Sequence, residues 1–219
     1  MDRSPFTLPR LLICEGEDDK AFFASFIEAR ALPRFHIQIT TSTGRPGGNT
    51  KFVHSLRSAK FNKGFDQLRH IIVATDCDGD HERSFHAVQQ QIRDAGFEAP
   101  TAPLVRSSEG SVPNSPTITI LMVPLTLQEG VLETMLVMPT RATNVPMSSK
   151  IDQFVADVGG DRWASRKQDK LWLRAALAAR CERDPFVSLP SVLTDQRYSG
   201  VVDLRHPSLD DLAGFLGQY

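Results

Sequence analysis

Short apolar runs alternate with helix-like segments through the first 140 residues, and this alternation is the feature that most restricts the fold. Between the runs, apolar residues recur at the spacing of amphipathic helices, as around Phe22 to Ile27, Phe52 to Leu56 and Phe85 to Ile92. Repeated strand–helix units predict an α/β fold, with a parallel or mostly parallel sheet flanked by helices. The four predicted strands are Leu11 to Cys14, Phe35 to Thr40, His70 to Thr75 and Thr117 to Val123.

Strand-like runs become rare after Pro139, and helical patterns replace them. Three helices are predicted: one through Ile151 and Val158 with Ser148 or Ser149 as its cap, one over Arg166 to Glu182, and one from Pro207 to Gly217. We therefore expect an α/β domain over residues 8–140 and a helical C-terminal region over 141–219 packed on it. The glycine-rich stretch from Thr43 to Thr50 is predicted to be a loop.

The composition excludes several classes of protein. With 41% hydrophobic and 23% charged residues among 219, the chain has enough apolar material for a core. Its 25 basic and 26 acidic residues give no overall basic excess. Three widely spaced cysteines do not form a disulfide framework or a CxxC metal site. The sequence lacks a membrane-length apolar run and a signal-peptide pattern, so we expect a cytoplasmic protein with no membrane contact.

Acidic residues follow two of the predicted strands. The first strand is followed by Glu15-Gly16-Glu17-Asp18-Asp19, and the third by Asp76-Cys77-Asp78-Gly79-Asp80. Ligand sites of open α/β sheets form at the carboxyl ends of the strands, and carboxylates that converge there repel each other unless a cation lies between them. Mg²⁺ prefers such oxygen ligands, so the pattern predicts a metal site.

A third acidic pair, Glu129 and Glu133, follows the fourth strand, and at a spacing of four residues the pair would share one face of a helix. Any single acid in these loops could instead cap a helix, as Asp18 or Asp19 could for the first one. An EF-hand does not fit, since the sixth and twelfth positions from Asp76 are His81 and Ala87. A phosphatase that uses the Asp-x-Asp pair remains a rival.

Two motifs together resemble the Toprim domain, which occurs in topoisomerases, bacterial primases, recombination-repair proteins and OLD-type nucleases. They are LLICEGEDDKAFF and HIIVATDCDGD, and the resemblance covers about residues 10–140. The later LQEGVLETML looks like the acidic helix of OLD-type and stand-alone Toprim proteins. The resemblance implies a Rossmann-like Toprim fold without the ATPase domain of a full-length OLD protein.

The resemblance also implies roles for individual residues. Glu15 would be a general acid/base or a metal ligand, and Asp76 and Asp78 would be metal ligands. Asp19, Glu129 and Glu133 would serve a second ion, so that two Mg²⁺ or Mn²⁺ ions are expected. Two further residues fit the pattern: Asp80, which extends the aspartate motif, and Lys170, a candidate for the functional lysine of OLD-type nucleases. For Lys170, the other interpretation is a solvated stripe with Arg166 and Arg174.

A nucleic-acid substrate requires some positive surface. The segment from Arg30 to Arg69 has eight basic residues and a single acidic one. Four of the basic residues are candidate phosphate contacts, although a charged helix is often only a solvated face: Arg45, Lys51, Arg57 and Lys60.

These observations predict a nuclease that depends on Mg²⁺ or Mn²⁺, acts on DNA or RNA, and serves phage defence or nucleic-acid processing. A non-catalytic or partner-activated Toprim subunit, for example with an ATPase partner, is the main alternative, and a phosphomonoester phosphatase is a weaker one. A homodimer is compatible with the sequence. Whether the substrate is DNA or RNA stays open.

Overall fold

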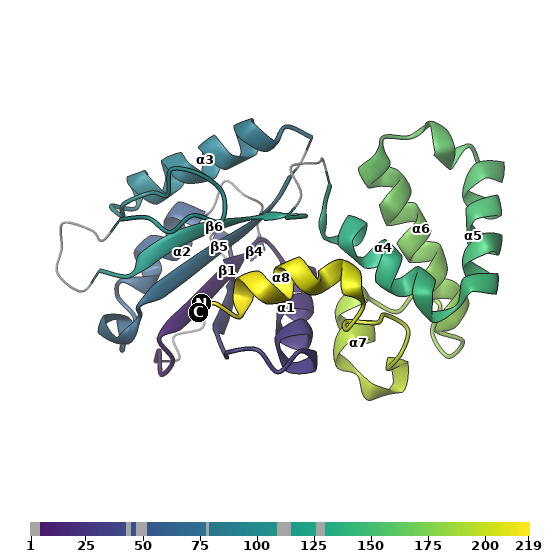
Figure 1. Ribbon diagram of the computed structural model, residues 1–219, viewed down its shortest axis with the longest axis horizontal. Helices are drawn as coiled ribbons and strands as arrows, with labels where there is room; N and C mark the ends of the chain where they lie inside the picture. Colours follow the sequence, from purple (N-terminus) through teal and green to yellow (C-terminus); the bar gives the residue numbers. More distant parts are fainter. Residues whose placement is uncertain (1–4, 43–44, 47–51, 78, 109–114, 126–129) are drawn as a thin grey trace.

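The computed structural model describes residues 5–42, 45–46, 52–77, 79–108, 115–125 and 130–219. Its main sheet has four parallel strands in the order β2-β1-β5-β6 (Figure 1). The four predicted strands are confirmed, with ends shifted by one residue at most. Their bounds are β1 (Arg10–Cys14), β2 (His36–Ile39), β5 (His70–Asp76) and β6 (Thr117–Val123).

A small second sheet joins β3 (Thr41–Ser42) to β4 (Arg45–Pro46) in antiparallel register. The predicted loop over 43–50 is therefore wrong for residues 45–46, which pair with the residues just after β2. A strand of two residues is too short to leave a periodic pattern in the sequence. The prediction of a loop therefore rested on the glycine and proline content of the segment.

Helices cover both faces of the main sheet and form most of the C-terminal region. They are α1 (Glu17–Ala29), α2 (Phe52–Ala59), α3 (His81–Asp94), α4 (Leu132–Thr143), α5 (Val145–Asp157), α6 (Ser165–Arg180), α7 (Leu189–Thr194) and α8 (Asp210–Leu216). Short 3₁₀ helices lie at Phe65–Gln67, Gly160–Arg162, Gln196–Tyr198 and Pro207–Leu209. No helix in these described parts is long and apolar enough to cross a membrane.

The cap predicted for the helix through Ile151 is wrong. The N-cap of α5 is Asn144, whose side-chain oxygen accepts a hydrogen bond from the Met147 N–H at 3.1 Å. Ser148 already lies inside the helix, and its hydroxyl donates back to the Asn144 carbonyl at 2.9 Å. Pro146 fits the first turn of the helix, where its missing N–H costs nothing. The helix therefore starts before the proline rather than behind it.

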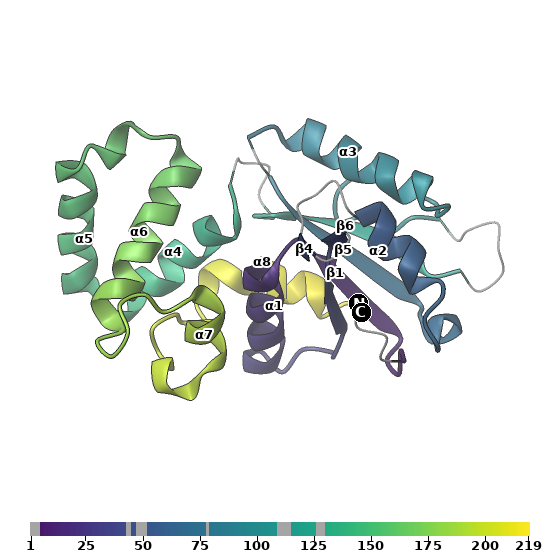
Figure 2. The same cartoon turned by 180° about the vertical axis from the view of Figure 1, so that it is seen from behind.

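The strands alternate between two cores because successive side chains point to opposite faces of the sheet. In β1, Leu11 and Ile13 face the core under α2 and α3, while Leu12 and Cys14 face the core under α1 and α8. Figure 2 shows the same arrangement from behind, with α2 and α3 on one side of the sheet and α1 on the other. β1, β5 and β6 are almost wholly buried, as in other parallel sheets, whereas β2 at the edge of the sheet is only partly buried.

The helical C-terminal region shares its core with the sheet. Leu173 and Leu177 of α6 belong to the same buried cluster as Leu12 of β1 and Leu136 of α4. Helix α4 runs across the expected boundary between 140 and 141, so the two regions are joined by a continuous helix. A smaller core between α5 and α6 is built from Ile151, Val155, Trp172 and Ala176.

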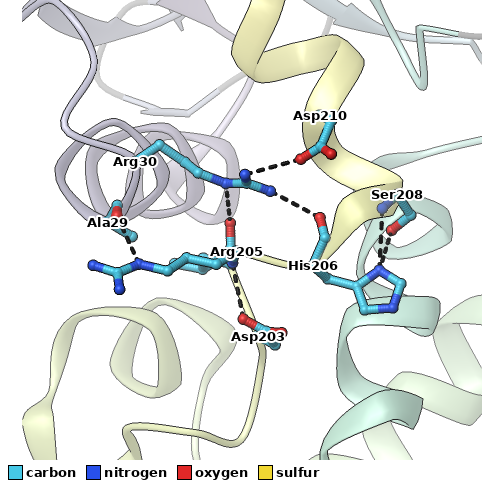
Figure 3. Close-up of polar contacts among 8 residues, drawn as sticks. Ala29, Arg30, Asp203, Arg205, His206, Ser208 and Asp210 are labelled. Carbon is cyan, nitrogen blue, oxygen red and sulfur yellow. Dashed lines mark hydrogen bonds and ion pairs between the residues drawn. The ribbon is translucent and has the colours of Figure 1, made fainter.

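Arg30, the residue after α1, fixes the C-terminal segment to the rest of the molecule (Figure 3). Its guanidinium donates to the carbonyls of Leu204 and His206, both at 2.8 Å, and forms an ion pair with Asp210 at 2.9 Å. Arg205 returns the contact by donating to the Ala29 carbonyl at 3.0 Å. One side chain thus satisfies several polar groups that no regular secondary structure pairs.

Candidate carboxylate site

Neighbouring parallel strands bring the first two predicted acids together. β1 and β5 pair in register, with Ile13 opposite Val73, so Glu15 just after β1 lies beside the end of β5. The Glu15 Oε1 atom accepts hydrogen bonds from the Thr75 hydroxyl at 2.7 Å and from the Asp76 N–H at 3.1 Å. The side chain of Glu15 therefore reaches the last two residues of β5, as strand order at a carboxyl edge allows.

Asp76 connects this edge to the start of α4. Its Oδ1 atom accepts a hydrogen bond from the Leu132 N–H at 3.2 Å, one of the amides at a helix N-terminus that lack an intrahelical partner. The backbone of Gly130 also bonds to the Cys77 carbonyl at 3.2 Å. A Cβ at residue 130 would lie 2.7 Å from Pro124 Cδ, so glycine permits this close approach. These contacts place Glu133, in the first turn of α4, near the carboxyl edge.

The pKa of Asp19 is strongly raised. Its Oδ2 atom accepts a hydrogen bond from the Gly16 N–H at 2.9 Å, at the start of α1. Burial raises the pKa of Asp19 to about 7, opposed by that hydrogen bond and reinforced by the charges of Glu15, Asp18 and Glu133. Glu15 and Glu133 therefore act on Asp19 from different elements, so the structure brings three of the predicted acids into one electrostatic neighbourhood.

The cysteine beside these acids is a packing residue. Cys14 is buried, and burial, followed by the negative charge of Asp19, raises the pKa of its thiol well above the usual value. A thiol held neutral in this way is a poor nucleophile. Carboxylates, rather than a cysteine, dominate the chemistry that this edge can offer.

Helix α6 adds side chains from the C-terminal region. The Nζ atom of Lys170 lies 3.9 Å from Oε2 of Glu133, so the predicted lysine does reach the carboxylate site. One residue earlier, Asp169 accepts a hydrogen bond from the Thr134 hydroxyl at 2.7 Å. Thr134 Oγ1 in turn accepts from the Val131 N–H at 3.2 Å. These contacts hold the first turn of α4 in place.

Sequence reasoning missed Thr75, Thr134 and Asp169. Thr75 carried a signal, because a hydroxyl next to Asp76 interrupts an otherwise apolar strand. Asp169 carried a weaker one, since it is the single acid in the basic stretch RKQDK. Thr134 carried none, because its role depends on contact between α4 and α6.

Asp80 follows the end of β5 and lies at the start of α3, where its carboxylate bonds within that helix. Asp80 is exposed and caps α3, accepting a hydrogen bond from the Arg83 N–H at 2.9 Å. Asp78, Glu129 and Lys51 lie outside the described residues, as does the side chain of Arg45.

A helix that continues from residue 129 to Glu133, as the spacing of four residues predicted, is interrupted at Val131. Val131 has an extended backbone with φ −140° and ψ 176°, and α4 begins only at Leu132. The spacing of four residues suggested a helix, but Gly130 makes a bridge to Cys77 just before it begins. Glu133 lies in the first turn of α4, and Glu129 lies outside the described residues.

Arg57 and Lys60 lie at the opposite edge of the sheet. They contact the end of α3, which starts at the carboxylate edge and runs back along the sheet (Figure 1). Arg57 donates to the Asp94 carbonyl at 2.6 Å, and Lys60 donates to the Ala95 and Gly96 carbonyls at 2.8 and 3.0 Å. Lys60 also lies 4.1 Å from the ring centre of Phe97, and desolvation lowers its pKa. Both side chains thus stabilise a helix C-terminus.

The described residues do not by themselves form a metal cluster. No group of three or more His, Cys, Asp or Glu side chains in residues 5–42, 45–46, 52–77, 79–108, 115–125 and 130–219 is placed to hold a metal ion. The donor chemistry nevertheless fits a hard divalent cation, because the acids offer carboxylate oxygens and repel one another. Burial is the main cause of the raised pKa of Asp19, and a cation at this edge would relieve the repulsion from Glu15, Asp18 and Glu133 that adds to it.

The fold defines an α/β protein with a four-stranded, all-parallel, Rossmann-like sheet and a carboxylate-rich carboxyl edge. The chain matches the family model "Protein of unknown function (DUF3226)" over residues 9–218, and it therefore belongs to that family. No curated protein and no solved structure matches it.

Proposed function

We propose that this protein is a Toprim-like nuclease that depends on Mg²⁺ or Mn²⁺ and cleaves phosphodiester bonds of nucleic acid. The observation that carries the proposal is the contact between Glu15 and the end of β5, where its Oε1 atom bonds to the Thr75 hydroxyl and the Asp76 N–H. These are the two motifs whose joint occurrence resembles Toprim, and they meet at one edge. Asp19 and Glu133 add negative charge to the same place.

The residues present suggest a division of roles. Glu15 and Asp76 would hold one divalent ion, and Asp19 and Glu133 would serve a second. When bound, such ions neutralise charge on the phosphate and generate a nucleophilic hydroxide near neutral pH. The hydrogen bonds from the Thr75 hydroxyl and the Asp76 N–H hold the Glu15 carboxylate at the end of β5, beside the predicted ion. Lys170, next to Glu133, supplies a positive charge for a phosphate oxygen.

Cleavage assays with amide variants test the proposal. Wild-type protein, Glu15→Gln and Asp76→Asn are incubated with plasmid, single-stranded DNA and structured RNA in Mn²⁺, Mg²⁺ or EDTA. We expect metal-dependent cleavage by the wild type and a loss of about a hundredfold or more in each variant. Glu17→Gln is the matched control, because it removes an exposed carboxylate from the same stretch.

Cleavage that persists in both amide variants would refute the assignment of this site. Absence of cleavage in the wild type, with Mn²⁺ binding lost in Glu15→Gln, would instead favour a partner-activated or binding subunit. Hydrolysis of a small phosphomonoester without any attack on nucleic acid would favour a phosphatase. The substrates that are cut would also decide between DNA and RNA.

A further inference from the structure

We infer that the exposed side of α6 is the surface that binds the nucleic-acid backbone, through Lys167 and Arg174 on either side of Lys170. This inference rests on the proposed function and names where its polymeric substrate lies. We propose this surface instead of the contacts predicted for Arg57 and Lys60. Those two side chains bond to the end of α3 at the opposite edge of the sheet.

The sides of α6 are distinguished by what they contact. One side faces α4, where Asp169 bonds to Thr134 and Leu173 joins the main core. Another faces α5, through Trp172, whose indole N–H donates to Asp152 at 2.8 Å. At 3.6 residues per turn, Lys167, Lys170 and Arg174 fall within an arc of about 60° that belongs to neither contact. The structure agrees, since all three side chains are exposed.

The charge on this arc is positive only. The one acid in the first half of α6, Asp169, points instead toward α4. Within the part of the chain that the structure describes, Lys167 and Arg174 form no ion pair, and Lys170 has one long contact to Glu133. Other arginines of this region are already used: Arg141 pairs with Asp152, and Arg180 donates to the Val201 and Gly200 carbonyls at 2.9 Å. Among the described residues, Lys167 and Arg174 are therefore cations that stabilise no other part of the fold through an ion pair.

The positively charged arc lies next to the carboxylate site. Along the helix axis, Lys170 lies between Lys167 and Arg174, and its Nζ atom lies 3.9 Å from Oε2 of Glu133, so the arc continues directly into the carboxylate site. Lys167 and Arg174 lie about one turn away on either side, at a spacing of about 5 Å along the helix. A phosphodiester chain laid along α6 would meet successive cations and pass the carboxylates at its centre. A small phosphate ester would need Lys170 alone.

Binding measured without catalysis tests the inference. Fluorescently labelled single-stranded DNA, duplex DNA and single-stranded RNA are titrated in EDTA at several salt concentrations, and anisotropy is recorded. The test variant is Lys167→Glu with Arg174→Glu, which leaves Lys170 intact. The matched control is Lys63→Glu with Arg93→Glu, two exposed cations with the same change in net charge. Lys167→Ala with Arg174→Ala is a milder second variant.

We expect the test variant to bind nucleic acid at least about tenfold more weakly than the wild type. The slope of log affinity against log salt concentration should decrease by the amount that about two phosphate contacts contribute. The affinity of the control variant should stay within about twofold of the wild-type affinity, because its two changed residues lie outside α6. Its net charge equals that of the test variant, so it measures the effect of net charge alone. The inference is overturned if both double variants weaken binding equally, if neither does, or if the wild type binds no nucleic acid at low salt. The nucleic acid bound most tightly distinguishes DNA from RNA.

A separate assay distinguishes failure of the nuclease proposal from failure of the α6 binding surface. Hydrolysis of bis(p-nitrophenyl) phosphate with Mn²⁺ reports on the carboxylate site without a polymer. We expect the Lys167→Glu, Arg174→Glu variant to keep wild-type activity in this assay while losing nucleic-acid binding. If the wild type shows no hydrolysis but binds through α6, the nuclease proposal fails and the binding surface stands.

Discussion

Replacement of Asp19 by Asn should stabilise the metal-free protein, and the gain should grow with pH. Asp19 combines burial with the nearby charges of Glu15, Asp18 and Glu133, which raise its pKa from 3.8 to about 7. Asn is nearly isosteric with Asp, and its side-chain oxygen can still accept the hydrogen bond from the Gly16 N–H. The substitution therefore removes the ionisation and leaves the helix cap.

The sign and size follow from the linkage between ionisation and folding. Because the pKa is higher in the folded than in the unfolded state, the stabilising effect of the proton is complete below about pH 4 and is lost as pH rises through about 7. At about 1.4 kcal/mol per pKa unit, burying the ionised carboxylate costs about 4 kcal/mol above pH 8. At pH 5.5 the group instead takes up a proton on folding, which costs about 2 kcal/mol. Asp19→Asn should gain about these amounts.

Urea denaturation of both proteins in EDTA, at about pH 5.5 and 8.5, measures the two differences in free energy of unfolding. Glu17→Gln controls for the loss of one negative charge near the start of α1, because Glu17 is exposed. A gain that is equal at both pH values, or a loss of stability at pH 8.5, would refute the reasoning. Addition of Mn²⁺ at pH 8.5 should stabilise the wild type more than Asp19→Asn, since only the former keeps the carboxylate.

Three further predictions concern the contacts that hold the site and the C-terminal region. Thr134→Val should lower the free energy of unfolding by about 1–2 kcal/mol in urea, because the Val131 N–H and Asp169 each lose a partner; an unchanged value would show that these bonds are replaced by water. Tyr219→Phe should cost about 1 kcal/mol, and a double-mutant cycle with Thr119→Val should show coupling, since the two hydroxyls lie 2.7 Å apart in a buried position; purely additive effects would contradict the bond. Arg30→Met should cost about 2–4 kcal/mol and make the C-terminal segment more sensitive to protease, because two carbonyls lose a charged donor; cleavage at wild-type rates would argue against a fixing role.

Much of the fold could be predicted because burial on both faces of a parallel sheet leaves uninterrupted apolar runs. β6 matches its prediction from Thr117 to Val123, and β5 extends it by one residue to Asp76. The same runs locate the carboxyl edge, so the convergence of Glu15 with Asp76 followed from strand adjacency alone. Helix starts were harder, because the side-chain cap of Asn144 and the extended backbone of Val131 are local features that leave no periodic pattern.

The contribution of the C-terminal region could not be derived from pattern, because it depends on which helices touch. Lys170 could be named only through a resemblance, and the pairing of Asp169 with Thr134 requires α6 to lie against α4. Composition was misleading for Arg57, since a basic segment in the sequence indicates nothing about whether its donors are already occupied. In the structure, that arginine donates to the end of α3.

Three predicted acids at the carboxyl edge each accept a backbone N–H from a neighbouring segment: Glu15 from Asp76, Asp76 from Leu132, and Asp19 from Gly16. Each acid therefore orients a stretch of backbone at the carboxyl edge in addition to carrying charge. Alanine at any of these positions would remove both contributions, and a loss of activity would then be ambiguous between chemistry and local structure. An amide keeps an accepting oxygen and removes the charge alone. Activity lost in Glu15→Gln with stability retained would therefore assign a chemical role to the charge, whereas activity retained would assign the carboxylate to holding β1 against β5.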